Sequence, residues 1–294
     1  MTASDTPAFE DPRVTLGRHG LLPKRSFSQN FLVARPTVEA IARAPNLSFD
    51  ETVIEIGPGV GTLTAALLRR GADVFAVERD RDMAALLRQE FADFPRFRLM
   101  EADATGLDFA ALLAQEGRDL VVVGNLPYAI TGALMRTLMR GRAEMREAVV
   151  MVQREVAARL GAEAGSEAYG ALSVFTQASF QVERLLQVSP GSFHPPPRVA
   201  SAVVRLRPLA QPRALETAAF RAVVKAAFGG RRKTLRKALA PLVTSGPSSR
   251  ERLDAAGIDS GLRGETLDVE TFASLAKQFE DLFAQPREDG RVEK

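Results

Sequence analysis

The sequence predicts a doubly wound α/β domain followed by a small helical domain. From Phe27 to about Arg207, short apolar runs rich in β-branched residues alternate with helical patterns, as expected of βαβ units with right-handed crossovers. One of these runs, Leu120–Val123, is apolar without interruption, which is typical of a central parallel strand covered on both faces. After Pro208 the helical patterns continue without strand patterns between them. A length of 294 residues fits two domains of ordinary size.

The strands of the first domain are expected where short apolar runs end at glycine or polar residues. They are Thr52–Ile56, Asp73–Glu78, Phe97–Glu101, Leu120–Val123, Ala148–Val152 and a closing antiparallel pair, Val182–Val188 and Ala202–Leu206. The helices between them are expected where apolar residues recur on one helical face, as Leu63, Leu67 and Leu68 do. They are Val60–Arg70, Arg81–Glu90, Phe109–Gln115, Ile130–Arg140, Glu155–Leu160 and Ala171–Phe180.

The two ends of the chain differ from this central domain. Residues 1–26 mix proline, glycine and charge without periodicity, so we expect an N-terminal arm there. The main domain then covers 27–207, and the helical domain covers 208–294 with a polar end from residue 286. The helices of the second domain are expected at Ala214–Phe228, Lys233–Leu242, Ser249–Ala256 and Val269–Phe283.

The composition excludes several kinds of site. Cysteine is absent, which removes disulfides, thiolate–metal sites and a cysteine nucleophile. Only His19 and His194 are present, too few for a multi-histidine metal centre. Carboxylate-bound Mg²⁺ stays possible, but nothing in the sequence indicates it, so no metal cofactor is expected. No apolar run approaches the roughly 20 residues of a membrane span, and residues 1–15 carry acids and prolines rather than a signal peptide. We therefore expect a cytoplasmic protein without a membrane partner.

A glycine-rich turn follows the first expected strand. Gly57, Gly59 and Gly61 give the spacing G-x-G-x-G directly before a helix. Glycines let the chain turn sharply and let a ligand approach the helix N-terminus closely. The spacing differs from the G-x-G-x-x-G of nicotinamide-binding proteins, and the G-K-[ST] of a P-loop is missing. A ligand site and a simple tight turn both remain open at this point.

Polar side chains follow the next three strands. Glu78 ends the second strand, Asp103 follows the third and Asn125 follows the fourth. Doubly wound sheets bind ligands at the carboxyl ends of their strands, and a carboxylate about 20 residues after the glycine turn accepts ribose hydroxyls. The turn contains no basic residue that could hold a pyrophosphate. S-adenosyl-L-methionine, with S-adenosyl-L-homocysteine as its product, therefore fits better than a dinucleotide.

Asn125 also begins the sequence Asn-Leu-Pro-Tyr, which resembles motif IV of amino-methyltransferases that act on exocyclic amines. Four further motifs are SQNFL at Ser28–Leu32, FHPPPRV at Phe193–Val199, GGRRKTL at Gly229–Leu235 and RGETL at Arg263–Leu267. Together the five resemble the KsgA/RsmA family of small-subunit ribosomal RNA adenine N6,N6-dimethyltransferases, from about Lys24 to Phe283. The resemblance implies a Rossmann-like class I methyltransferase fold with a helical RNA-binding domain.

The resemblance also implies roles for the residues that match the family. The cofactor-binding positions are Asn30, Leu32, Gly57, Gly59, Glu78, Asp103 and Asn125. Asn30 and Leu32 would close over the cofactor, and Gly57 would contact its methionine end. Glu78 would hold the ribose, and Asp103 would meet the adenine amine. The implied substrate is a pair of adjacent adenines in a hairpin near the 3′ end of 16S rRNA, in the 30S particle or its precursor. The implied role is in small-subunit biogenesis, and we expect a monomer.

The Asn-Leu-Pro-Tyr segment suits methyl transfer to an aromatic amine, whose lone pair is delocalised into the ring. Hydrogen bonds from the amine to the Asn125 side-chain oxygen and the Leu126 carbonyl would favour a pyramidal nitrogen that faces the methyl group. Pro127 fixes φ, and Tyr128 can stack on an extruded base with Phe193 on its other side. No strong general base is required, because N6 becomes acidic as the methyl group arrives, and catalysis would come mainly from alignment and preorganised dipoles. The alternative is that both aromatic residues are core residues.

Basic residues cluster at the start of a helix in the second domain. Five of the seven residues at positions 231–237 are cations: Arg231, Arg232, Lys233, Arg236 and Lys237. Since Leu235 and Leu239 would face the core, we expect the cations to point outward and to bind RNA phosphates. Lys24 and Arg25 would extend this patch from the arm. Taken alone, the same face could be solvated surface.

The chain departs from the family pattern at Ser28, Ala129, Ala200 and Gly229–Gly230, which leaves arm and RNA contacts open. Two other functions also remain open. An Erm-type methyltransferase would act on large-subunit rRNA, although the RRKTLRK and RGETL segments favour the small subunit. A binding protein, such as an assembly checkpoint or a transcription-factor relative, would not need the intact Asn-Leu-Pro-Tyr segment and its carboxylates.

Overall fold

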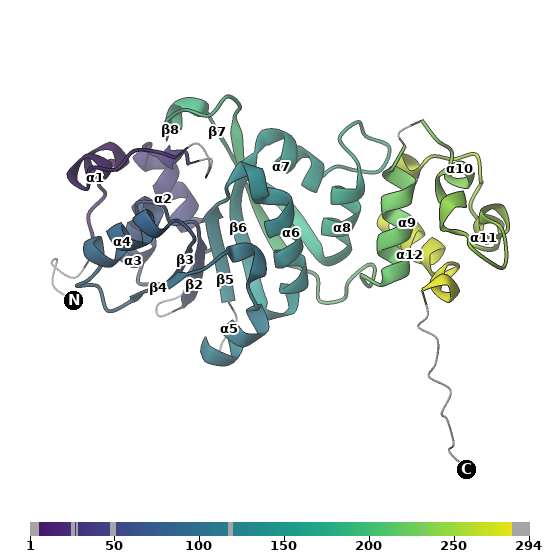
Figure 1. Ribbon diagram of the computed structural model, residues 1–294, viewed down its shortest axis with the longest axis horizontal. Coiled ribbons are helices and arrows are strands. Elements are labelled where there is room, and N and C mark those ends of the chain that lie inside the picture. The colour runs from purple at the N-terminus through teal and green to yellow at the C-terminus, as the bar shows by residue number, and fades with distance from the viewer. Residues whose placement is uncertain are drawn as a thin grey trace, which may run out of the picture. The chain divides into compact units, whose positions relative to one another are not determined.

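The computed structural model describes residues 6–24, 27, 29–47, 51–116, 120–230 and 232–283. The chain divides into two compact units (Figure 1): Met1–Gly161 with Phe180–Ala210, and Ala162–Ser179 with Gln211–Lys294. The first unit is built on a large sheet with helices on both faces, and the second unit is helical. The α/β fold with a helical C-terminal region that the sequence predicts is confirmed.

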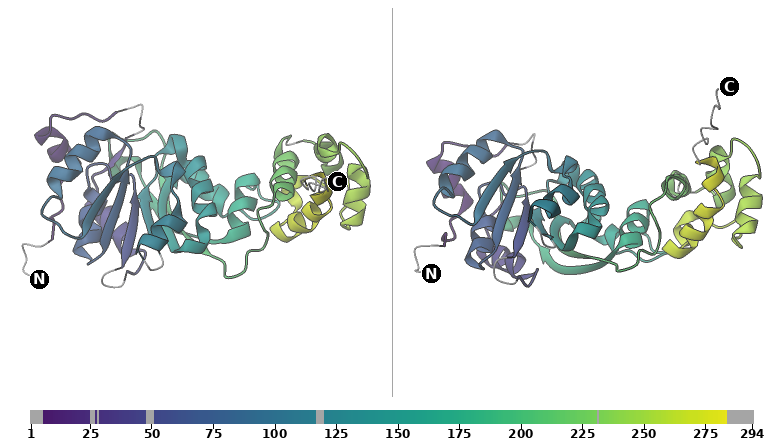
Figure 2. Two further views of the ribbon diagram at one scale, coloured as in Figure 1. Left: turned by 60° about the horizontal axis from the view of Figure 1, so that its bottom comes forward. Right: turned by 90° about the horizontal axis from the view of Figure 1, so that it is seen from below.

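The sheet of the first unit, which can be seen in Figure 2, has seven strands. Their order is β4-β3-β2-β5-β6-β9-β7. The strands are β2 (Thr52–Ile56), β3 (Asp73–Glu78), β4 (Phe97–Glu101), β5 (Leu120–Asn125), β6 (Met145–Gln153), β7 (Phe180–Val188) and β9 (Ser201–Pro208). Five strands are parallel, and β9 runs antiparallel between β6 and β7. The chain adds β3 and β4 on one side of β2, and then adds β5 and β6 on the other side. The strand order therefore reverses between β2 and β5. Doubly wound sheets bind ligands outside the carboxyl ends of the strands at such a point.

Helices cover both faces of this sheet. Those of the first unit are α1 (Pro12–Arg18), α2 (Arg35–Arg43), α3 (Thr62–Arg69), α4 (Arg81–Glu90), α5 (Phe109–Glu116), α6 (Thr131–Arg140) and α7 (Arg154–Leu160). One core cluster joins buried residues of α2, α3 and α4 to one face of the strands. Right-handed crossovers carry α5 and α6 to the opposite face. Both faces of the sheet are therefore covered by helices, and a ligand can reach the sheet at the carboxyl ends of its strands.

Among the described residues, the structure contains two α-helices and two short strands that the sequence analysis does not predict. In the expected arm, α1 begins at Pro12 after the N-cap Asp11, and its Leu16 is 3% exposed in the core of the first unit. The second is α2. The other two, β1 (Phe31–Leu32) and β8 (Phe193–His194), form a two-residue antiparallel ladder. Segments as short as α1, β1 and β8 show no periodicity, so only tertiary contacts identify them.

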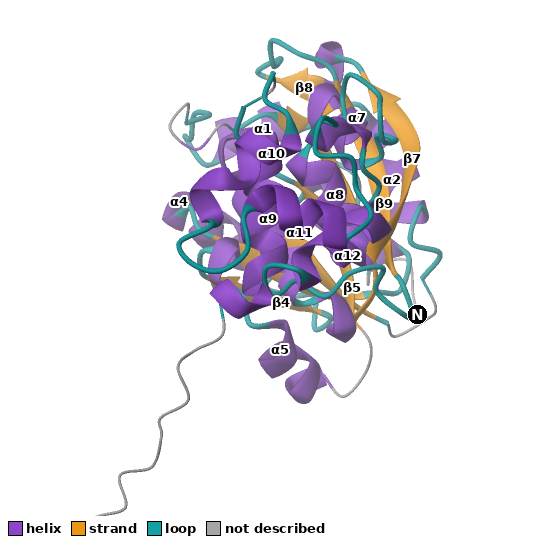
Figure 3. Cartoon of the chain, turned by 90° about the vertical axis from the view of Figure 1, so that its right-hand side faces the viewer, coloured by secondary structure: helices purple, strands orange, loops and turns teal. Residues whose placement is uncertain are grey.

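The second unit contains α8 (Ala171–Ser179), α9 (Ala218–Phe228), α10 (Leu235–Leu239), α11 (Ser249–Ala255) and α12 (Val269–Lys277), purple in Figure 3. The sequence analysis places α8 in the first domain, and this is wrong. Val174 and Ala178 of α8 are buried in the same cluster as Phe220 and Phe272 of the second unit. A helical pattern shows that a helix has an apolar face but does not show which core that face joins.

Candidate active site

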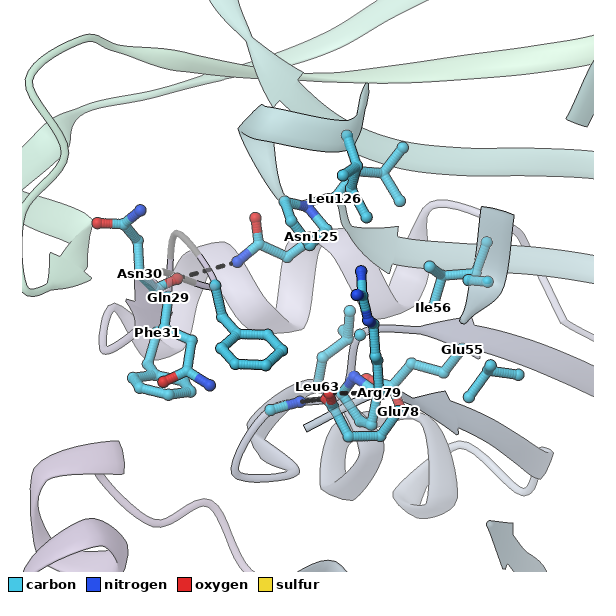
Figure 4. Close-up of a pocket in the computed structure, with 18 of the residues that line it drawn as sticks. Gln29, Asn30, Phe31, Glu55, Ile56, Leu63, Glu78, Arg79, Asn125 and Leu126 are labelled. Atoms are coloured by element: carbon cyan, nitrogen blue, oxygen red, sulfur yellow. Dashed lines mark hydrogen bonds between the residues drawn. The ribbon is translucent and has the colours of Figure 1, made fainter. Parts of the chain in front are cut away.

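A cavity of about 150 Å³ lies at the carboxyl ends of the strands in the first unit. It is lined by residues at the ends of β2, β3, β4 and β5, and by Phe27 and residues 29–32 (Figure 4). All seven cofactor-binding positions that the sequence predicts line this cavity: Asn30, Leu32, Gly57, Gly59, Glu78, Asp103 and Asn125. Leu126, Pro127 and Tyr128 line it as well, so the two groups of predicted residues share one site.

The glycine turn between β2 and α3 is fixed by conformation and by packing. Gly59 has φ +59° and Gly61 has φ +84°, both in the left-handed region that glycine tolerates. A Cβ at Gly59 would lie 2.9 Å from the Phe31 ring, and a Cβ at Gly61 would lie 2.3 Å from the Phe91 ring. Gly59 lines the cavity, whereas Gly61 does not line it and packs against Phe91 and Leu87. The turn is therefore both part of the cavity wall and a tight structural turn.

Glu78 ends β3 with its carboxylate held by backbone donors. Oε2 accepts the N–H of Gly59 at 3.1 Å, and Oε1 accepts the N–H groups of Arg79 and Asp80, both at 2.8 Å. The side chain is 8% exposed, and burial raises the pKa of Glu78 while these hydrogen bonds oppose the rise. Oε2 accepts fewer bonds from the protein than Oε1, so it has capacity for a donor from a ligand.

Glu55 of β2 is a second buried acid at the cavity, and the sequence analysis gives it no role. It is 1% exposed, and its Oε2 accepts the hydroxyl of Thr64 at 2.6 Å. Burial raises the pKa of Glu55 to about 8, with a smaller contribution from the neighbouring Glu78 charge. An acid inside the otherwise apolar run of Thr52–Ile56 is the sequence signal that could have identified it.

We expect Glu55 to make the stability of the protein depend on pH. Its folded pKa of about 8 lies above the ordinary value of 4.5, so between these values the folded state binds more protons than the unfolded state. The free energy of unfolding should therefore fall as the pH rises through this range. Urea unfolding of Glu55→Gln should show a smaller fall than the wild type. Equal falls in both proteins would show that Glu55 ionises at its ordinary pKa.

Asp103 and Arg79 form an ion pair at the rim of the cavity. Asp103 Oδ1 accepts the N–H and the hydroxyl of Thr105 at 2.9 and 2.7 Å, and Oδ2 lies 3.1 Å from the Arg79 guanidinium. The bonds from Thr105 lower the pKa of Asp103, and the Arg79 charge contributes in the same direction. A ligand amine at Asp103 would meet Oδ2, the oxygen that Arg79 also contacts. The sequence analysis does not name Arg79, whose only signal is its place beside Glu78.

Asn125 ends β5 with its amide held in one orientation. Its Nδ2 donates to the backbone carbonyl of Asn30 at 3.0 Å (Figure 4). This bond leaves Oδ1 to accept hydrogen bonds from a ligand. Leu126 is 1% exposed and also lines the cavity. Pro127 has φ −57°, and its carbonyl accepts the N–H of Ile130 at 3.2 Å, which begins the turn towards α6.

The two aromatic residues that are expected to stack on a base differ in their surroundings. The half-buried Tyr128 lines the cavity, and its hydroxyl lies 2.5 Å from Ser201 Oγ. Burial raises the pKa of Tyr128, so the phenol stays neutral. Phe193 is 3% exposed and belongs to the core of the first unit, because β8 pairs with β1 through Leu32. Phe193 is not among the residues that line the cavity in this structure, and its stacking on a base stays a prediction.

The basic residues of the second unit lie around α10. Of the five predicted RNA contacts, Arg232, Lys233, Arg236 and Lys237 are exposed. Leu235 and Leu239, on the other face, are fully buried. Arg231 lies outside the described residues. The helix itself is shorter than expected, since it begins at Leu235 after the N-cap Thr234.

Lys24, which the sequence analysis expects to extend this patch from the arm, forms ion pairs within the first unit. Its ammonium lies 2.7 Å from Asp80 and 2.6 Å from Asp82, and these bonds raise the pKa of Lys24. Its charge is thus already paired within the first unit. Arg25 and the departure from the family pattern at Ser28 lie outside the described residues, whereas Ala129 is exposed and the carbonyl of Ala200 accepts the N–H of Arg154.

Neither a metal-ligand cluster nor a membrane-spanning helix is found in the part of the chain that the structure describes. Among the residues that the structure describes, no three His, Asp or Glu side chains gather as ligands for a metal ion. Across the same part of the chain, no helix is long and apolar enough to cross a membrane.

Comparisons with known proteins agree with this geometry. The family model described as "Ribosomal RNA adenine dimethylase" matches residues 21–281. A relative from Anaeromyxobacter sp. (strain K), "Ribosomal RNA small subunit methyltransferase A", is 46% identical over 285 residues, which cover 92% of this chain and 99% of the relative.

Two solved structures are also similar in fold. A dimethyladenosine transferase from Plasmodium falciparum has a TM-score of 0.73 and 24% identity, covering 86% of this chain and 98% of that one. The 23S rRNA methyltransferase ErmE has a TM-score of 0.63 and 29% identity, covering 85% and 100%. The chain belongs to the ribosomal RNA adenine dimethylase family, and the predicted enzyme class, an S-adenosyl-L-methionine-dependent rRNA adenine dimethyltransferase, is confirmed.

Proposed function

We propose that this enzyme dimethylates N6 of two adjacent adenines in a hairpin near the 3′ end of 16S rRNA, within the 30S particle or its precursor. The observation that carries the proposal is one cavity that joins the buried carboxylate of Glu78 to the oriented amide of Asn125. The first is suited to a cofactor ribose and the second to a target amine. Support for the small subunit comes from the name and 46% identity of the Anaeromyxobacter relative, against 29% for ErmE. We further propose that it acts as a cytoplasmic monomer in small-subunit biogenesis.

The residues at the cavity fit S-adenosyl-L-methionine. Glu78 Oε2 would accept a ribose hydroxyl beside the N–H of Gly59, and Asp103 Oδ2 would accept the adenine amine. Gly57 and Gly59 would let the methionine portion lie against the backbone, with Asn30 and Leu32 closing the opposite side. The cofactor supplies, when bound, an electrophilic methyl group on a sulfonium. Since the positive sulfur already makes a good leaving group, we propose that no metal ion takes part.

The protein acts on the target amine by orienting it. Asn125 Oδ1 and the Leu126 carbonyl would accept the two N–H groups of N6, which favours a pyramidal nitrogen with its lone pair towards the methyl group. The nitrogen becomes acidic as its new bond forms, so no strong general base is needed. Tyr128 would stack on the extruded base. The rate enhancement would then come from alignment and from dipoles that are fixed before the reaction.

The cations among residues 231–237 would bind RNA phosphates. The proposed contacts are Arg231, Arg232, Lys233, Arg236 and Lys237. Charges that neutralise phosphates release counterions, so their contribution to binding falls as salt rises. These residues would position the RNA, while the cavity would select the base.

We expect the double variant Arg231→Glu/Arg232→Glu to bind 16S rRNA about tenfold or more weakly at low salt. The plot of log affinity against log salt should become shallower by about 2, because two phosphate contacts are lost. Filter binding at several salt concentrations measures both, and calorimetry should show unchanged cofactor affinity. Arg250→Glu is the control, since Arg250, like Arg232, is exposed in the second unit but lies 3.8 Å from Asp254. A binding defect that does not depend on salt would contradict the assignment.

The function itself is tested by incubating the protein with labelled cofactor and under-methylated 30S particles. Mass spectrometry of the digested 16S rRNA should locate two adjacent N6,N6-dimethyladenines near the 3′ end. Label in 23S rRNA alone would instead support the large-subunit alternative. No incorporation, together with no cofactor binding by calorimetry, would support the binding-protein alternative.

A further inference from the structure

Asp80 is a buried acid next to the cavity that neither the proposed cofactor contacts nor the proposed target contacts use. It is 2% exposed at the N-cap of α4, where its Oδ1 accepts the N–H of Asp82 at 3.0 Å. The same oxygen lies 2.7 Å from the Lys24 ammonium, and Oδ2 accepts the side-chain amide of Gln29 at 2.7 Å. A helix cap needs only one of these bonds, and the other two hold a segment 51 or more residues away in the sequence.

The segment that Asp80 holds includes Gln29 and Asn30, and Asn30 is hydrogen-bonded to the side-chain amide of Asn125. The Gln29 side chain is fixed at both ends, because its Oε1 also accepts the N–H of Lys24 at 2.8 Å. The next residue, Asn30, presents the backbone carbonyl that accepts Asn125 Nδ2 at 3.0 Å. If this carbonyl moves away, nothing in that contact distinguishes the two ends of the Asn125 amide, and Oδ1 and Nδ2 can exchange places.

Asp80 also contacts the cofactor side of the cavity. Its backbone N–H donates to Glu78 Oε1 at 2.8 Å. One residue thus bonds to the carboxylate proposed for the ribose and, through its side chain, to the segment that orients Asn125. Figure 4 shows Gln29 and Asn30 beside Asn125, and Glu78 elsewhere on the cavity wall.

We propose that Asp80 is a positioning residue that, through Gln29 and the Asn30 carbonyl, keeps Asn125 Oδ1 directed at the target amine. This proposal rests on the role proposed above for Asn125. Asp80 touches neither substrate nor cofactor in this scheme. Asp80 acts by preventing the Asn125 side chain from flipping. A flipped side chain would present its Nδ2 donor to the target N6, whose N–H groups need an acceptor.

The first test compares Asp80→Ala with Asp82→Ala in steady-state methylation of 16S rRNA in 30S particles. We expect Asp80→Ala to lower kcat by about 10²-fold, as small misplacements in an active site do, without change in the KM for the particles. Asp82→Ala is the matched control, since Asp82 also pairs with Lys24 at 2.6 Å but has a side chain that is 51% exposed and does not bond to Gln29. We expect its kcat to be unchanged. A fall in kcat of the same size in both variants would overturn the proposal.

A second variant separates positioning from the helix cap. Gln29→Ala removes the bond to Asp80 without touching α4, and it should lower kcat with no change in the thermal stability of the protein. Asp80→Asn keeps an oxygen acceptor and should recover part of the activity that Asp80→Ala loses. Normal kcat in Gln29→Ala would contradict the proposal even if Asp80→Ala did not fold.

The decisive measurement introduces Asp80→Ala and Gln29→Ala, each separately, into the Asn125→Ala variant. The methylation rate is then measured under single-turnover conditions with excess enzyme. If Asp80 and Gln29 act through the Asn125 amide, neither should lower the rate further there. The same loss in both backgrounds would show an independent role and overturn the proposal. Full activity in Asn125→Ala alone would instead refute the proposed role of Asn125, and methylation of 23S rRNA by the wild type would refute the proposed substrate.

Discussion

Asn125→Ala should lower kcat for methyl transfer by about 10²–10³-fold, the range found when one preorganised polar group is removed from an active site. The variant lacks the oxygen that would accept a hydrogen bond from the target amine, so the lone pair of N6 stays delocalised in the ring. The exposed cations around α10 are unchanged, so affinity for 16S rRNA should be unchanged. Single-turnover methylation with labelled cofactor gives the rate, and filter binding gives the affinity.

Gln153→Ala is the matched control for this substitution. Gln153 ends β6 as Asn125 ends the neighbouring β5, but it does not line the cavity. We expect its kcat to be unchanged, and we expect calorimetry to show cofactor binding in both variants. If Asn125→Ala lost RNA affinity in proportion to its rate, the residue would serve binding and not alignment.

Glu78→Ala should weaken S-adenosyl-L-methionine binding by about 10²-fold. A hydrogen bond to a charged group contributes about 1.5–3 kcal/mol, and each 1.4 kcal/mol is about tenfold in affinity. The variant loses the acceptor proposed for the ribose, and it also leaves the N–H of Gly59 without the partner that shapes the glycine turn. Isothermal titration calorimetry with the cofactor measures the change directly.

Glu101→Ala is the control for Glu78→Ala. Glu101 lies directly across from Glu78 on the neighbouring strand β4, but it pairs with Arg88 at 3.1 Å and does not line the cavity. We expect its cofactor affinity to equal that of the wild type. An equal loss in both variants would mean that charge near the sheet edge matters and that the Glu78 contact does not.

Much of the first unit could be predicted from the sequence because its strands carry local patterns. Thr52–Ile56, Asp73–Glu78 and Phe97–Glu101 have the same bounds in the structure as in the prediction. Their carboxyl ends share one edge of a parallel sheet by geometry alone. Residues as distant as Gly57 and Asn125 were therefore predictable neighbours, before any contact between them was known.

The partners of individual side chains could not be predicted in the same way. Lys24 is a cation whose sequence neighbours suggest RNA, but the fold brings Asp80 and Asp82 to it. Phe193 lies in a motif that suggests stacking, but pairing of β8 with β1 buries its ring. Such outcomes depend on contacts between segments far apart in the chain, which no local pattern encodes.

The sequence by itself determined the α/β architecture, the glycine turn and the identity of the residues at the strand ends. These follow from periodicity and from the fixed direction of parallel strands, and both are local properties. Only the tertiary structure decided that α8 joins the second unit, that Glu55 is buried with a raised pKa, and that Asn30 and Asp80 hold the site together. The physical reason is that burial, pKa and hydrogen-bond partners depend on which distant segments pack together, and packing is a property of the whole fold.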